Sequence, residues 1–228
     1  MAIKDLAIFV VAEGISKSVV NRFRKCVQFS CSNLKYDIYV LGNAKKKTDL
    51  YKGFNKCKVL NAALRKLKGK EYKVLCQTDI DVIFPPKMLE YGFQRALEGK
   101  FLFHNDMMRV NPESDKTFKS LPKTYNQLDW KQYAKRMKKE FIDATGCFNI
   151  MQKEYWYETG GWCEDFRAWS REDDYYMECV KKYTDIKIIS SHKFPLLHYN
   201  HPRRTKDNRR QNDVVRNKYR KKGFVNWL

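Results

Sequence analysis

The stretch CQTDIDVIFPP, from Cys76 to Pro86, ends an apolar, strand-like run with two carboxylates, Asp79 and Asp81, and then with two prolines. On a strand, residues two apart share a face, so the pattern predicts that both carboxylates lie side by side. Two like charges that close raise each other's pKa unless a cation stands between them. The pattern therefore indicates either a solvated strand end whose charges limit edge pairing or a divalent metal site.

The rest of the chain alternates between strand and helix patterns. DLAIFVVA, YDIYVLGN and YKVLCQTDIDVIF predict strands, with helices at SKSVVNRFRKCVQFS and KCKVLNAALRKLKG. Further along, FIDATGCFNIM, DIKIIS and PLLHY predict strands, with helices at KEYWYETGGW and REDDYYMECVKKY. This order predicts an α/β fold: one domain with a doubly wound, mostly parallel sheet and helices on both faces. Ligands of such sheets bind beyond the carboxyl ends of the strands, which is where Asp79 and Asp81 lie.

The predicted domain covers residues 1–204 and is followed by a basic C-terminal tail, residues 205–228. Residues 105–140 are polar and lack periodicity, which predicts a long excursion or lid between the two halves of the domain, residues 1–104 and 141–204. The stretch HPRRTKDNRRQNDVVRNKYRKK, which leads into and includes most of the tail, concentrates basic residues.

Charge is the strongest signal in the composition. The 228 residues include 46 Lys and Arg against 26 Asp and Glu, a formal net charge of +20. Such a charge predicts a polyanionic partner, and nucleic acid, an acidic glycan and an anionic membrane surface all fit. Seven cysteines without a CxxC pair favour reduced thiols over a disulfide scaffold or a zinc ribbon. No signal peptide or membrane-spanning run is recognised, so we expect a cytoplasmic protein of a bacterium or of a virus-infected cell.

Two further clusters carry chemistry. WSREDDYY places Glu172, Asp173 and Asp174 at the start of a predicted helix. A favourable interaction with the positive end of the helix dipole explains the presence of one or two of these acids. A third carboxylate could serve as a general base. HYNH places His198 and His201 after the last predicted strand. Carboxylate and imidazole ligands together suit Mn²⁺ or a similar ion better than Ca²⁺, and the spacing leaves zinc open.

Four blocks carry a resemblance to a known family. FNKCKVLNAAL, TDIDVIFPP with its DxD motif, GCFNIMQKEYWYETGGWCEDFRAWSREDDYY and LLHYNHPRR cover much of residues 54–204. In this order they resemble the sugar-nucleotide-dependent glycosyltransferases of the GT-A fold, in particular the β-1,4-galactosyltransferase and chondroitin N-acetylgalactosaminyltransferase group. The resemblance implies transfer of a hexose or N-acetylhexosamine from a UDP-sugar to an acceptor hydroxyl, with Mn²⁺ or Mg²⁺ as cofactor. It implies inversion of the anomeric carbon, with retention as the alternative.

The resemblance also implies roles for individual residues. Asp173 matches the catalytic base, with Glu172 beside it. The implied metal ligands are Asp79, Asp81, His198 and His201. The residues implied to bind the nucleotide sugar are Phe54, Asn55, Lys56, Lys58, Asp79, Ile80, Trp169 and Arg203. Those implied on the acceptor side are Gly161, Trp162, Trp169, Glu172 and Asp174. The chain departs from the family at Ser170 and Arg171, where two glycines usually stand, so the identities of donor and acceptor do not carry over.

The acceptor is left with two interpretations. A hydroxymethylated base in viral DNA is favoured slightly by the net charge, and Trp130, Trp156 or Trp162 could hold the base after it is flipped out of the duplex. The other interpretation is that the acceptor is a glycan or a lipid-linked surface polysaccharide. The basic tail would then contact anionic lipid headgroups. A non-catalytic nucleic-acid-binding protein is the alternative outside enzymes, although no helix-turn-helix, zinc-finger or RNA-recognition signature occurs. The sequence makes no prediction about the oligomeric state.

Overall fold

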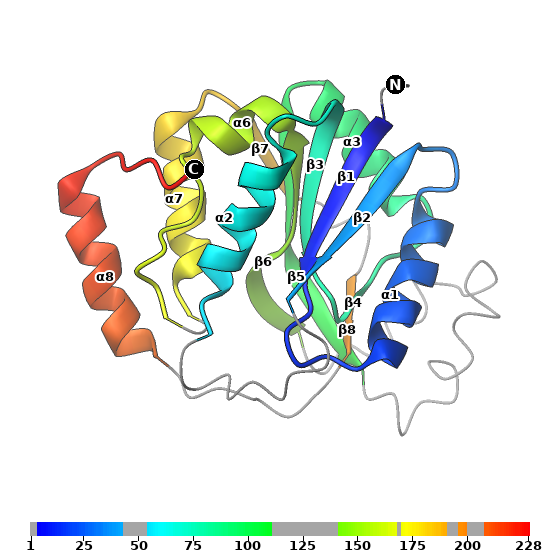
Figure 1. Cartoon of the computed structure of the whole chain (residues 1–228), viewed down its shortest axis with the longest axis horizontal. Helices are drawn as coiled ribbons and strands as arrows, with labels where there is room; N and C mark the ends of the chain where they lie inside the picture. The colour runs from blue at the N-terminus through cyan, green and yellow to red at the C-terminus, as the bar shows by residue number, and fades with distance from the viewer. Residues whose placement is uncertain (1–3, 43–53, 111–140, 168–169, 191–195, 200–207) are drawn as a thin grey trace.

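The protein is built around one mixed β-sheet with helices on both faces (Figure 1). The computed structural model describes residues 4–42, 54–110, 141–167, 170–190, 196–199 and 208–228. The strands are β1 (Lys4–Val11), β2 (Tyr36–Leu41), β3 (Tyr72–Asp79), β4 (Val82–Ile83), β5 (Lys100–Val110), β6 (Phe141–Gln152), β7 (Lys187–Ser190) and β8 (Leu196–Tyr199). Their order across the sheet is β2-β1-β3-β6-β5-β8-β4, and β7 pairs with β5 as well.

The sheet changes character halfway across. Strands β2, β1 and β3 are parallel, as the alternating strand and helix patterns predict. Strand β6 then runs antiparallel to both β3 and β5, while β7 and β8 pair in parallel with successive parts of β5. Strand β4 is antiparallel to β8. Four of the seven pairings are thus parallel, and the α/β prediction is confirmed.

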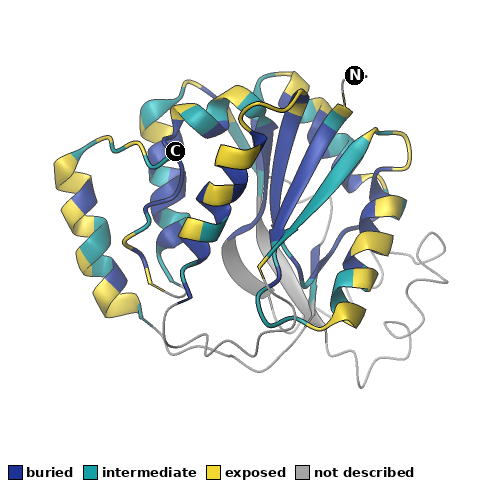
Figure 2. Ribbon diagram, in the orientation of Figure 1, coloured by how far each residue is buried: buried dark blue, intermediate teal, exposed yellow. Residues whose placement is uncertain are grey.

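Each face of the sheet carries its own apolar core (Figure 2). Helices α1 (Lys17–Ser30) and α3 (Met88–Leu97) cover one face. Helices α2 (Lys56–Leu67), α6 (Lys153–Glu158) and α7 (Glu172–Tyr183) cover the other, and α8 (Arg209–Lys222) packs outside α7. Helix α2 illustrates how an apolar stripe attaches a helix to the sheet. Its buried side chains recur at helical spacing: Leu60, Ala63, Leu64 and Leu67.

The structure corrects two predictions about the sheet. Strand β3 ends at Asp79, and Ile80 and Asp81 form a turn before β4. The two carboxylates therefore do not share one face of a continuous strand. Strand β5 runs on to Val110, so residues 105–110 belong to the sheet and not to the predicted excursion. The polar residues in NDMMRV conceal this strand, which pairs with β8 over Met107 to Val110. Residues 111–140 lie outside the described part of the chain.

The segment predicted as a basic C-terminal tail is built into the fold. Its residues 209–222 form helix α8. After the helix, Trp227 donates a backbone hydrogen bond to the carbonyl of Gly160, at 2.8 Å, and Leu228 packs on the core. Arg65 on α2 donates to the carbonyl of Trp227 at 2.7 Å. The C-terminus thus links α2 to the loop that follows α6.

Two findings bear on the compositional predictions. None of the helices in the described ranges is long and apolar enough to cross a bilayer.

All seven cysteines belong to the described residues, and each is buried and outside any disulfide, as predicted. Burial raises the pKa of the Cys26 thiol to about 12, and it raises that of Cys31 equally. These thiols behave as small apolar core residues.

Candidate active site

A buried lysine stands at the centre of the site. Lys56 is the first residue of α2, directly after Asn55, whose side chain accepts a hydrogen bond from the Lys58 amide at 2.9 Å and so caps the helix. Only 3% of the Lys56 side chain is exposed. The helix dipole disfavours a cation at this end, and burial disfavours it further. The ammonium must therefore be stabilised by acids brought from elsewhere in the chain.

Three carboxylates surround the Lys56 ammonium. Its Nζ lies 3.1 Å from Asp173 Oδ2, 3.6 Å from Asp79 Oδ1 and 3.8 Å from Glu172 Oε1. Asp79 is the last residue of β3, while Glu172 and Asp173 begin α7. We call these four residues the carboxylate cluster. It lies at the carboxyl end of β3, where the α/β fold predicts a ligand site.

Gly146 on β6 allows Asp173 to reach this position. Its φ is +91°, and a Cβ built on it would lie 2.1 Å from Asp173 Cγ. Only glycine avoids this clash and adopts the left-handed backbone without strain. Asp173 Oδ2 accepts the hydrogen bond from Lys56, whereas its buried Oδ1 has no hydrogen-bond partner among the described residues. One oxygen of this carboxylate is therefore left to bind something else.

Three carboxylates face one ammonium, which leaves an excess of negative charge when all of them are ionised. The pKa values of Glu172, Asp79 and Lys56 are all shifted in this environment. Burial, followed by the charge of Asp173, raises the pKa of Glu172 to about 7, although Lys56 opposes the shift. Burial raises the pKa of Asp79 to about 6, opposed by Lys56 and assisted by Asp81 and Asp173. The pKa of Lys56 is well above its usual value because the three acids outweigh its burial. Such a cluster attracts cations.

Asp81 and His198 form a second polar group next to the cluster. Strand pairing places Val82 opposite His198, and Asp81 Oδ2 lies 3.3 Å from His198 Nε2. Asp81 lies two residues after Asp79, and its charge raises the pKa of Asp79, so the two groups are neighbours. Carboxylate and imidazole are donors that fit a transition ion such as Mn²⁺. Within the described residues, however, no three His, Cys, Asp or Glu side chains converge closely enough to hold a metal. His201 lies outside these residues.

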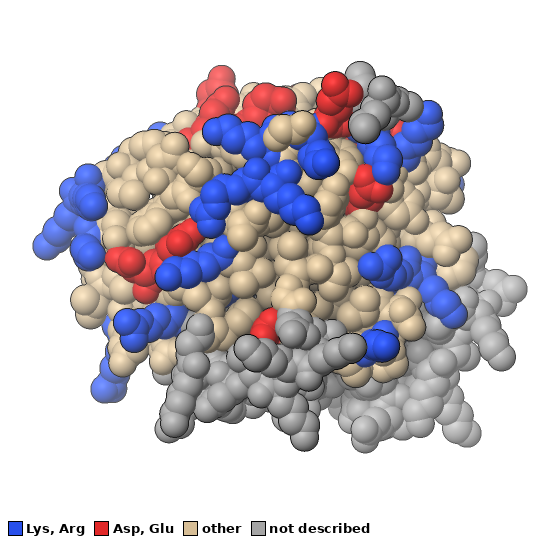
Figure 3. Space-filling model, viewed as in Figure 1, with Lys and Arg blue, Asp and Glu red and all other residues tan. Residues whose placement is uncertain are grey.

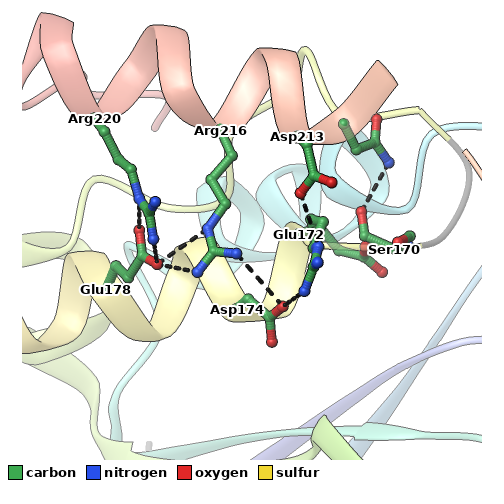
Figure 4. A network of polar contacts seen from close by, with 9 residues as sticks. Ser170, Glu172, Asp174, Glu178, Asp213, Arg216 and Arg220 are labelled. Carbon is green, nitrogen blue, oxygen red and sulfur yellow. Dashed lines mark hydrogen bonds and ion pairs between the residues drawn. The ribbon is translucent and has the colours of Figure 1, made fainter. Parts of the chain in front are cut away.

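The other predicted site residues fall into three groups. Phe54 and Ile80, predicted to bind the nucleotide, are buried in the apolar cores, whereas Lys58 is exposed. Asp174 forms an ion pair with Arg171 and faces α8 rather than Lys56 (Figure 4). Trp169 and Arg203 lie outside the described residues, as does Trp130.

Two acceptor assignments are not supported by the packing. Trp162 is 0% exposed and stacks on Tyr176 with ring centroids 4.3 Å apart, and Trp156 is equally buried. Neither ring can hold an extruded base without opening the core. Gly161 is buried as well, and its missing Cβ leaves room for Asn61 Oδ1, 2.6 Å from where that atom would be. These aromatic and glycine residues therefore shape the core beside the site.

Sequence reasoning missed three residues that build the site. Asn61 ties α2 to the loop after α6: its side chain donates to the carbonyl of Trp162 at 2.7 Å and accepts from the amide of Trp162 at 2.9 Å. Gly146 makes room for Asp173, and a glycine inside the strand pattern FIDATGCFNIM was the available signal. Asn212 on α8 is buried among backbone groups, and nothing in its basic surroundings indicated this.

Comparisons with known proteins agree with this architecture. No protein-family sequence model matches the chain, and no curated protein matches it by sequence. Among solved structures, the catalytic domain of Drosophila β1,4-galactosyltransferase 7 with xylobiose is similar, with a TM-score of 0.62 and 13% identity over 94% of this chain and 80% of that one. A variant of the same enzyme with manganese, UDP-Gal and xylobiose gives a TM-score of 0.61 at 13% identity, over 93% and 79%.

A third similar structure is GalNAc-T7 with UDP, GalNAc and Mn²⁺, with a TM-score of 0.57 and 10% identity over 95% of this chain and 48% of that one. The likeness extends over nearly the whole chain in all three cases. The protein therefore has the GT-A glycosyltransferase fold, as the sequence resemblance predicts.

Proposed function

We propose that the protein is a metal-dependent glycosyltransferase that moves a hexose or N-acetylhexosamine from a UDP-sugar to an acceptor hydroxyl. The observation that carries the proposal is Asp173: at the carboxyl end of a GT-A sheet, one of its oxygens is held by Lys56 and the other has no partner among the described residues. The similar structures support the proposal, because they hold UDP-Gal or UDP together with manganese.

Asp173 has the geometry of a general base. Lys56 donates a hydrogen bond to Oδ2 at 3.1 Å, which leaves Oδ1 to accept the proton of the acceptor hydroxyl. The acceptor oxygen then forms a bond to the anomeric carbon of the sugar while the bond from that carbon to the UDP oxygen breaks. Attack from the face opposite the leaving group inverts the anomeric carbon. Glu172, only 3% exposed and next to the base, orients the acceptor.

The metal would be held by Asp81 and His198, with Asp79 and His201 completing the set. Asp81 and His198 are already within 3.3 Å of each other and remain partly exposed. The donor set favours Mn²⁺, with Mg²⁺ as the alternative. When bound by these residues, such an ion would supply a Lewis acid for the diphosphate leaving group.

A carbohydrate is the acceptor that this site fits best. The similar galactosyltransferase structures hold xylobiose. Of the three tryptophans proposed to hold a flipped base, Trp156 and Trp162 are buried in the core, and Trp130 lies outside the described residues.

A test measures UDP release from a panel of UDP-sugars with Mn²⁺, offering xylobiose and related glycans in one arm and hydroxymethylated duplex DNA in the other. We expect turnover with a glycan, loss of roughly 100-fold or more in Asp173→Asn, and normal turnover in Asp185→Asn. Asp185 is a matched control because it is exposed and lies just after the far end of α7. Absence of UDP release with every donor, or full activity in Asp173→Asn, would overturn the proposal.

A further inference from the structure

The turn that precedes α7 has an unfavourable backbone conformation. Ser170 has a φ of 118° and Arg171 a φ of 70°, both in the left-handed region that residues with a Cβ rarely adopt. Conformations of this kind persist only where the surrounding structure holds them. The next two residues, Glu172 and Asp173, belong to the carboxylate cluster, so whatever holds this turn also positions the proposed base.

Asn212 on α8 holds the turn from the side. Its side chain is buried, and its Oδ1 accepts a hydrogen bond from the Arg167 amide at 3.2 Å. Its Nδ2 donates to the carbonyl of Arg167 at 3.0 Å and to the carbonyl of Ser170 at 2.8 Å. The amide thus uses both of its polar atoms on backbone 42 and 45 positions earlier in the chain.

The neighbouring residue of α8 holds the other half of the turn. Asp213 Oδ1 accepts from Arg171 Nε at 2.9 Å, and Arg171 Nη1 reaches Asp174 Oδ2 at 3.0 Å. About one and two turns further along α8, Arg216 and Arg220 both bind Glu178 on α7 (Figure 4). Helix α8 is therefore docked on α7 along its length, and Asn212 and Asp213 form the end nearest the cluster. We call these two residues the α8 clamp.

We propose that the α8 clamp, and Asn212 above all, is a positioning device for the transfer reaction: it keeps Ser170 and Arg171 in the left-handed conformation that directs Asp173 onto Lys56. This inference rests on the proposed function for its catalytic consequence. Within the turn, the Ser170 amide donates to Glu172 Oε2 at 2.6 Å, which couples the conformation of the turn to the acid beside the base. Gly146 leaves Asp173 little room, so a shift of the turn moves the carboxylate away from Lys56.

The test compares Asn212→Ala and Asn212→Asp with Val214→Ala, a control on the same helix whose side chain is 70% exposed. Asn212→Asp keeps the size and the acceptor but loses both donors. We expect kcat to fall about tenfold or more in both clamp variants, because misplacement by about 1 Å costs that much, while the KM for the UDP-sugar changes less than about twofold. Val214→Ala should retain the kcat of the wild type.

Adding Ser170→Gly to Asn212→Ala separates positioning from stability. Glycine adopts a φ of 118° without strain, so it should restore kcat towards the wild-type value even if the melting temperature stays low. An unchanged kcat per folded molecule in Asn212→Ala would overturn the inference, and so would the absence of any rescue by glycine.

Hydrogen exchange keeps this test separate from the proposed function. The Tyr175 amide donates to the carbonyl of Arg171 at 3.0 Å in the first turn of α7. If the wild type transfers no sugar, the proposed function fails, but the clamp is still judged by this amide. Faster exchange of the Tyr175 amide in Asn212→Ala than in Val214→Ala supports the clamp, and equal exchange overturns it.

Discussion

Replacing Lys56 by methionine should destabilise the protein strongly at high pH. Methionine keeps an unbranched side chain in the buried space but removes the only ammonium within 4 Å of Asp79, Glu172 and Asp173 in the described structure. Breaking a buried ion pair by removing one partner costs about 3–5 kcal/mol, because the remaining charge is left uncompensated. We therefore expect the free energy of unfolding to fall by about 3–5 kcal/mol at pH 8.

The loss of stability in Lys56→Met should depend on pH. The folded-state pKa values of Asp79 and Glu172, about 6 and about 7, lie above the ordinary values of 3.8 and 4.5. Between the ordinary and the raised values the folded state binds more protons than the unfolded state, so stability falls as the pH rises. Without Lys56, which opposes both shifts, the pKa values rise further and the fall becomes steeper. The loss in Lys56→Met should therefore be much smaller at pH 5 than at pH 8.

The assay is urea unfolding followed by tryptophan fluorescence, since Trp156 and Trp162 are buried in the core. Lys58→Met is the matched control, because it removes an exposed lysine two residues away and should change stability by less than about 0.5 kcal/mol at either pH. A loss in Lys56→Met that is equal at pH 5 and pH 8, or below about 1 kcal/mol at pH 8, would refute the electrostatic account.

Three further variants test the construction of the site. Gly146→Ala should displace Asp173 and lower kcat at least about tenfold; a wild-type kcat would show that the strand leaves more room than the structure indicates. Glu172→Gln should raise the free energy of unfolding at pH 8 by up to about 3 kcal/mol and leave it unchanged at pH 4, because the buried carboxyl is charged only at the higher pH. Urea unfolding at both pH values measures this, and a gain at pH 4 would contradict the titration argument. Asn61→Ala leaves buried backbone groups of Trp162 unpaired, so it should cost about 2–4 kcal/mol in calorimetry, and a cost near zero would argue against this link.

Local patterns in the sequence predicted most of the elements. Leu60, Ala63, Leu64 and Leu67 form a helical stripe that settles α2 before any tertiary contact is known. Apolar runs ended by Gly, Asn or Pro likewise indicated β1, β2 and β3. The acids predicted to matter, Asp79, Glu172 and Asp173, do come together. The helices and strands could be predicted because periodicity and helix capping are properties of neighbouring residues.

The partners of these acids could not be predicted in the same way. The resemblance implies that Lys56 binds the nucleotide sugar, but it is buried among carboxylates, one of them 117 positions away in the chain. Trp162 was expected at the acceptor and lies in the core. Composition does not distinguish an aromatic ring that packs from one that binds, because both uses favour the same residue. Asn212 could not be predicted for a related reason. Its neighbours in the sequence are mostly polar or charged, while its own role depends on hydrogen bonds to the distant backbone of Arg167 and Ser170.

The placement of basic residues decides how the net charge of +20 should be interpreted. Exposed lysines gather at the far end of α2 and the start of β3: Lys66, Lys68, Lys70 and Lys73. Figure 3 shows Lys and Arg side chains clustered over this end of the molecule. Along β3, Lys73 lies six residues before Asp79 of the carboxylate cluster, a length of about 20 Å.

On α8, Arg216 and Arg220 are bound to Glu178, so part of the charge predicted to bind a polyanion stabilises the fold instead. A polyanion attracted to the lysines of α2 and β3 would thus rest at the end of the sheet opposite the proposed base. Among the described residues the base itself lies beside Asp79 and Glu172, so its surroundings carry excess negative charge. The net charge of the chain therefore does not identify the acceptor.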